Sequence, residues 1–153
     1  MSKFINQFLL AVYLSLTSLT ITANDANISG VYIGYFAYDD QSLEDGTFFT
    51  MALVQKVNTL SGVISEVVVH NNREVVATST LDGFILGDKI LFTKKYDGSG
   101  GRDHTVAYEL TVKDEVLFGN WKINNATGPV VMGEPHQNNF IDSLESLLEN
   151  QTD

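Results

Sequence analysis

The sequence predicts an all-β protein: an eight-stranded antiparallel up-and-down β-barrel followed by a C-terminal amphipathic α-helix. Between residues 28 and 132, segments rich in Val, Ile, Thr, Tyr and Phe alternate with turn residues. No interval between these segments holds a 3.6-residue apolar repeat long enough for a crossover helix, so successive strands must pair antiparallel through hairpins. Eight strands of such a meander remove their free edges by closing into a barrel.

Eight strands are expected in this region. A two-layer sandwich is the alternative, but it would need longer crossing connections than the sequence contains. The predicted strands are residues 29–39, 46–55, 59–70, 74–85, 89–96, 104–112, 115–123 and 128–132.

The pattern changes after Gly133, where Pro135 ends the last strand. Apolar residues then recur at helical spacing, which predicts an amphipathic helix packed against the barrel. A helix that binds a partner is the alternative. The apolar stripe consists of Phe140, Ile141, Leu144, Leu147 and Leu148.

The N-terminal residues have the character of a secretory signal. Lys3 precedes a short apolar run at residues 8–16, and the small residue Ala23 suits a cleavage site. A retained membrane anchor is the alternative, but a spanning helix needs roughly 20 predominantly apolar residues. We therefore expect a signal peptide (1–23), a barrel domain (24–133), a C-terminal helix and tail (134–153), and a secreted or periplasmic protein.

Composition excludes several classes of function. The 153 residues include 19 Asp+Glu against 9 Lys+Arg, a net charge of −10, which argues against nucleic acid and anionic membranes as partners. The absence of cysteine excludes disulfides, thiolate-bound metals and a thiol nucleophile. No cofactor is expected.

The order of the hairpins predicts where a site lies. Successive turns of a meander alternate between the two ends of the barrel, so the short turns at 56–58, 86–88 and 113–114 share one end. The longer polar connections at 40–45, 71–73, 97–103 and 124–127 share the other. Such a barrel has one mouth, and barrel mouths are common ligand sites.

Eight antiparallel strands, a secretion signal and a C-terminal helix together resemble the calycin group of lipocalin-like and avidin-like barrels. Three segments also resemble small bacterial barrels of that type: Gly30–Phe36, Phe92–Gly98 and Gly119–Ile123. The resemblance implies a small secreted bacterial barrel. No binding residue transfers from it. Lipocalins have Gly-x-Trp on the first strand, whereas Gly119-x-Trp121 is on the seventh, and avidins use several tryptophans where this chain has one.

The mouth connections and adjoining strand ends supply the candidate residues. His70 and His104 lack the short spacing of a metal pair, so no metal site is predicted. Arg102, in a glycine-rich loop, is able to grip a carboxylate or phosphate, although a surface ion pair with Asp45, Asp97 or Asp103 is the favoured interpretation. No catalytic residues are assigned, because no nucleophile motif occurs. The predicted ligand-binding residues are Tyr38, Asp40, Asp45, His70, Tyr96, Arg102 and His104.

The leading functional hypothesis is an exported, non-enzymatic binding protein that takes a small, partly apolar ligand or a protein partner at the mouth. One alternative is an enzyme that uses Asp and His groups there; convergence of His70, His104 and a carboxylate would favour it. The other is an acidic inhibitor or interaction module, which a filled interior and a flat exposed patch would favour.

Overall fold

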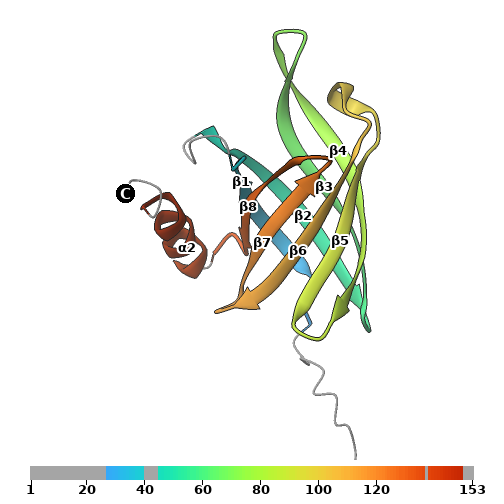
Figure 1. Ribbon diagram of the computed structural model, residues 1–153. Helices are drawn as coiled ribbons and strands as arrows, with labels where there is room; N and C mark the ends of the chain where they lie inside the picture. Colours follow the sequence, from blue (N-terminus) through green and yellow to red (C-terminus); the bar gives the residue numbers. More distant parts are fainter. Residues whose placement is uncertain (1–26, 40–44, 137, 150–153) are drawn as a thin grey trace, which may run out of the picture.

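A computed structural model describes residues 27–39, 45–136 and 138–149 of the chain, and it confirms the predicted barrel (Figure 1). Each strand pairs antiparallel with the next, and β1 pairs with β8 to close the sheet. The strands are β1 (Gly30–Phe36), β2 (Thr47–Lys56), β3 (Thr59–His70), β4 (Arg73–Leu86), β5 (Lys89–Tyr96), β6 (Thr105–Lys113), β7 (Val116–Ile123) and β8 (Ala126–Gly133).

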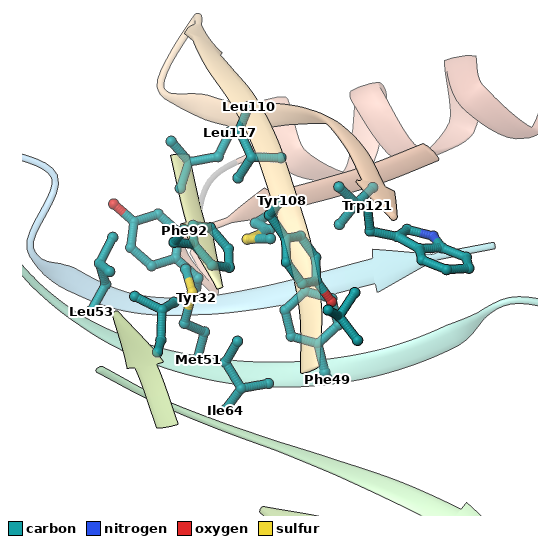
Figure 2. Close-up of a cluster of buried hydrophobic side chains, with 14 of the residues drawn as sticks. Tyr32, Phe49, Met51, Leu53, Ile64, Phe92, Tyr108, Leu110, Leu117 and Trp121 are labelled. Carbon is teal, nitrogen blue, oxygen red and sulfur yellow. The ribbon is translucent and has the colours of Figure 1, made fainter. Parts of the chain in front are cut away.

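Side chains alternate between the interior and the outer wall, because successive residues of a strand point to opposite faces. On β1, Tyr32 and Phe36 belong to the interior cluster, whereas Tyr35 belongs to a separate cluster outside the wall. Figure 2 shows the interior side chains meeting in one cluster, with Leu53 at one end and Trp121 at the other. The interior is thus a packed apolar core along much of its length.

The two ends of the barrel are built as the hairpin order predicts. The β2–β3, β4–β5 and β6–β7 turns are short and share one end, called here the tight-turn end. The β1–β2, β3–β4, β5–β6 and β7–β8 connections share the other end, the mouth.

The β3–β4 hairpin projects beyond its neighbours at the mouth (Figure 1). Strand pairing between β3 and β4 continues to His70 and Arg73, whereas β2 pairs with β3 no further than Glu66. A 3₁₀ turn, η2 (Ser99–Gly101), packs against this hairpin, and the sequence did not predict it. Gly101 has φ +70° and lies so close to the His70 ring that a Cβ there would overlap it.

Two strand boundaries differ from the prediction by more than one residue. Strand β1 ends at Phe36, but the chain still follows β8, since Ala37 N–H donates to Pro129 O (3.2 Å) and Asp39 N–H to Thr127 O (3.1 Å). Strand β8 begins at Ala126 rather than at residue 128. Gly128 permits this close approach, because a Cβ there would overlap the carbonyl oxygen of Ala37.

The helix α2 (Asn138–Glu149) packs on the outer wall, as the sequence predicts. Phe140 is buried against Tyr35, Val116 and Val131, and Leu144 packs beside them. The side chains of residues 141, 147 and 148 and the whole predicted signal segment lie outside the described residues. Within the described ranges, no helix has the length and apolar character needed to cross a membrane.

Candidate functional site

A cavity of about 330 Å³ opens at the mouth, above the packed interior. Inward positions of several strands form its wall, since alternation sends every second side chain of β5, β6 and β7 into the barrel. The residues that line it are Phe36, Tyr38, Lys94, Tyr96, Arg102, His104, Val106, Tyr108, Trp121, Ile123, Asn124, Asn125 and Ala126.

One wall of the cavity consists of three aromatic side chains, one of which is fixed by a hydrogen bond to the backbone. Trp121 Nε1–H donates a hydrogen bond of 2.8 Å to the carbonyl oxygen of Ala37. The Trp121 ring meets Phe36 and Tyr38 edge-on, at centroid distances of 5.8 and 4.7 Å. This arrangement is a favourable one for aromatic pairs, so the wall is fixed before any ligand arrives.

Beside the cavity lies a buried polar cluster of Glu66, Lys94 and Tyr96. Lys94 Nζ lies 3.0 Å from Glu66 Oε1 and 2.8 Å from the Tyr96 hydroxyl oxygen, and the Tyr96 hydroxyl also bonds Glu66 Oε1. The Lys94 and Glu66 side chains are each only 2% exposed. Glu66 Oε2 has no hydrogen-bond partner among the described residues. Burying such a pair costs several kcal/mol per ion before their attraction offsets it, so the pair is not explained by stability.

Burial and charge set the protonation states around the cavity. Burial lowers the pKa of Lys94, and the Glu66 carboxylate opposes this effect. Burial also raises the pKa of Tyr96, with further contributions from its hydrogen bond to Glu66 and from the charge of that carboxylate. The pKa of His104 is lowered by burial and then by Arg102, so His104 is neutral at pH 7. Lys94 is paired with Glu66, so among the described residues that line the cavity Arg102 is the charged side chain without an ion-pair partner.

Four of the predicted ligand-binding residues line the cavity: Tyr38, Tyr96, Arg102 and His104. His104 stacks on Tyr96 at a centroid distance of 4.6 Å.

The other three predicted residues are not brought into the cavity. Asp45 is exposed just before β2, and His70 is exposed at the end of the projecting hairpin. His70 extends past the mouth because β3 is longer than the strands that surround the cavity. Asp40 lies outside the described residues.

The favoured interpretation of Arg102 as a partner in a surface ion pair is wrong for the described carboxylates. Neither Asp45, Asp97 nor Asp103 lies within ion-pair distance of its guanidinium, and the ion pairs found in the described part of the chain involve other residues. Asp97 is instead bound by the Thr78 hydroxyl of β4 and, within its own loop, by Ser99 N–H at 2.9 Å. The hydrogen bonds from Ser99 and Thr78 lower the pKa of Asp97 to about 2.

Glu66 and Lys94 are the functional candidates that the sequence analysis missed. Both stand in phase with buried apolar residues: Glu66 two positions after Ile64, and Lys94 two positions after Phe92. Strict alternation along these strands was the signal that places both side chains inside. Charged residues are rarely fully buried, which is why the sequence analysis did not place these two side chains in the interior.

Two particular groupings of side chains are not found among the described residues. Within them, no three His, Asp or Glu side chains come close enough to hold a metal ion. The proposed convergence of His70 and His104 with a carboxylate is also absent, since His70 does not line the cavity.

Two further surface features are present on the barrel wall. A shallow groove of about 640 Å³ crosses the outer faces of β4–β7, lined by exposed side chains such as Asp82, Ala107 and Glu109. The outer face of β1–β4 is apolar, with Val31, Phe48, Val54, Val63, Val67, Val69 and Val76 each more than half exposed. The packed interior and this exposed apolar face are features that would favour an interaction module. Neither the groove nor this face, however, brings buried polar groups together as the mouth cavity does, and such convergence is typical of a small-molecule site.

Comparison with protein families, with curated proteins and with solved structures returns no match to this chain, so the functional argument rests on the geometry of the mouth.

Proposed function

We propose that this protein binds a small, partly apolar molecule in the mouth cavity and does so as a binding protein rather than as an enzyme. The observation that supports this is the cavity itself: aromatic walls and a few convergent polar groups above a filled barrel. Its volume, about 330 Å³, is at the lower end of the range typical of ligand pockets, roughly 300–1,000 Å³. A ligand of modest size therefore suits it better than a long lipid.

The arrangement of the polar groups favours binding over catalysis. The buried acid and base of the site, Glu66 and Lys94, are bonded to each other and to Tyr96. Glu66 itself does not line the cavity. A general base must lie within hydrogen-bond reach of the proton that it takes, whereas this carboxylate is outside the cavity lining and its Oε1 is bonded to Lys94 and Tyr96.

A neutral fluorescent probe, N-phenyl-1-naphthylamine, tests the proposal. Trp121, the single tryptophan, is among the residues that line the mouth cavity and also among those that line the outer groove, so energy transfer from Trp121 to the probe reports binding, and the variants below identify which of the two sites is occupied. We expect the probe to bind the full chain. In Ala126→Phe its affinity should fall at least tenfold, because the new side chain occupies the cavity and is about the size of the phenyl ring of the probe.

Ala107→Phe is the matched control, since Ala107 faces the outer groove rather than the cavity. Binding should be unchanged in this variant. The opposite result, loss in Ala107→Phe and none in Ala126→Phe, would move the site to the outer groove and contradict the proposal.

We also propose that the protein acts outside the cytoplasm, after removal of residues 1–23. The support is the signal-like character of these residues. Mass spectrometry of the protein expressed in a bacterium should find a soluble form that begins near Asn24. Recovery of an intact N-terminus in the membrane fraction would contradict this.

A further inference from the structure

We infer that the mouth cavity takes an organic anion, a carboxylate attached to an apolar body, and that Arg102 binds its anionic group. This inference rests on the proposed function and specifies the class of ligand.

The first argument is the charge of the cavity wall. The chain has about twice as many acidic as basic residues, yet among the described residues that line the cavity none is acidic and two, Lys94 and Arg102, are basic. Burial lowers the pKa of His104, and Lys94 is paired with Glu66, which leaves Arg102 as the cation of this described lining without an ion-pair partner. A cation in such a wall selects for negative charge in whatever enters.

The second argument is that the loop around Arg102 keeps its guanidinium available. The backbone of Arg102 is bonded at both ends, by its own N–H to Ser99 O (3.1 Å) and by Gly98 N–H to its carbonyl oxygen (2.9 Å). Asp97, the carboxylate of the same loop, is occupied by Thr78 and Ser99. The guanidinium lies close enough to the cavity to lower the pKa of Lys94 and of His104. A guanidinium presents a planar set of donors that matches a carboxylate.

The third argument comes from the donors of Lys94. An ammonium group has three N–H donors, and the contacts with Glu66 Oε1 and the Tyr96 hydroxyl use two of them. The third donor remains for the cavity that Lys94 lines. A carboxylate is able to accept from Arg102 and from Lys94 at once, because it has two oxygens.

The aromatic wall of the cavity favours a ligand whose anionic group is attached to an apolar body. Phe36, Tyr38 and Trp121 form apolar and edge-on aromatic surface beside the cations. A bare inorganic anion would leave this surface in water. An anion with an apolar body covers it, at a gain of roughly 25 cal/mol per Å² of buried apolar area.

The test compares 4-phenylbutyrate with its neutral isostere 4-phenylbutanamide, by calorimetry and by quenching of Trp121. We expect the acid to bind the full chain at least tenfold more tightly than the amide. Arg102→Ala should weaken binding of the acid by about 10- to 150-fold, the range for hydrogen bonds to charged groups, and change that of the amide by less than about twofold. Arg102→Lys should restore part of the loss.

Arg73→Ala is the matched control, because Arg73 is the other arginine of the chain, is exposed, and lies at the tip of the projecting hairpin away from the cavity. It removes the same charge and should leave the affinity for the acid unchanged within about twofold. Equal losses in Arg73→Ala and Arg102→Ala would overturn the inference, since they would show an effect of net charge only.

Two other results also overturn the inference. Equal binding of acid and amide, with the neutral naphthylamine probe still bound, would refute the ligand class and leave the proposed function intact. Competition by inorganic phosphate as strong as that by 4-phenylbutyrate would show that the apolar body contributes nothing. Failure of the neutral probe to bind would instead refute the proposed function itself.

Discussion

The two ends of the barrel carry different kinds of side chain at equivalent inward-pointing positions. At the tight-turn end the inward residues are apolar, as with Leu53, Leu60 and Leu110, each at most 3% exposed. At the mouth, the same alternation places Glu66 and Lys94 inside. One end therefore contributes stability and the other holds polar groups that stability does not explain.

The contrast has an energetic basis. A fully buried aliphatic side chain stabilises a fold by roughly 1.5–3 kcal/mol, whereas a buried ion pair often contributes nothing beyond an apolar pair of similar size. Glu66 and Lys94 therefore fit the proposed binding site better than they fit a purely stabilising role. The predictions below separate the two ends, beginning with the largest expected effect.

Removing one member of the buried pair should be the most damaging change at the mouth. Lys94→Met leaves the Glu66 carboxylate buried without its counter-charge, so we expect a loss of about 3–5 kcal/mol in the free energy of unfolding. Urea denaturation measures it.

The double variant Lys94→Met/Glu66→Leu is the control for this effect. It removes both charges, and its stability should return to within about 1 kcal/mol of the wild type or exceed it. If the double variant were as unstable as Lys94→Met alone, the pair would be contributing stability and the contrast between the ends would fail.

At the tight-turn end, Leu110→Ala should cost about 2–5 kcal/mol, because it leaves a cavity among packed side chains. Binding of the naphthylamine probe at temperatures well below the melting point should not change. A large loss of affinity in the folded variant would show that the two ends are coupled.

On the outer wall, Leu144→Asp should cost about 1–3 kcal/mol, less than the core change because Leu144 is only partly buried on Tyr35 and its neighbours. Glu145→Asp, an exposed substitution in the same helix, should change the melting temperature little. An unchanged melting temperature in Leu144→Asp would favour a helix that binds a partner.

The smallest effect should come from Asp97, which fixes the Arg102 loop. Its pKa is lowered from 3.8 to about 2 in the folded protein, so the ionised carboxylate stabilises the fold above about pH 4 and this contribution disappears as the pH falls through about 2. The stability difference between the wild type and Asp97→Asn should therefore be present at pH 7 and vanish near pH 2. A difference independent of pH would contradict the assignment.

The sequence predicted the architecture well because its signals are local. Period-two alternation and turn residues located all eight strands, and hairpin alternation then placed the mouth. Tyr38, Tyr96, Arg102 and His104, which line the cavity, could be placed at the mouth because they lie in or beside mouth connections.

The remaining parts of the site depend on tertiary geometry. The extra length of β3 that removes His70 from the cavity is set by its pairing with β4 alone. The hydrogen bond between the Thr78 hydroxyl and the Asp97 carboxylate, which engages Asp97 away from Arg102, joins residues 19 positions apart. Neither relation has a signature in the local sequence.

The seam between β1 and β8 has a consequence for how the barrel opens. The two strands have four registered pairs, such as Tyr35 with Val131, against twelve between β3 and β4, and the pair Ile33–Gly133 joins residues one hundred positions apart. Both Tyr35 and Val131 lie beneath Phe140 of α2. In native-state hydrogen exchange, we expect the amides of this seam to exchange through the partial opening of lowest free energy. This opening requires α2 to detach from the barrel wall first.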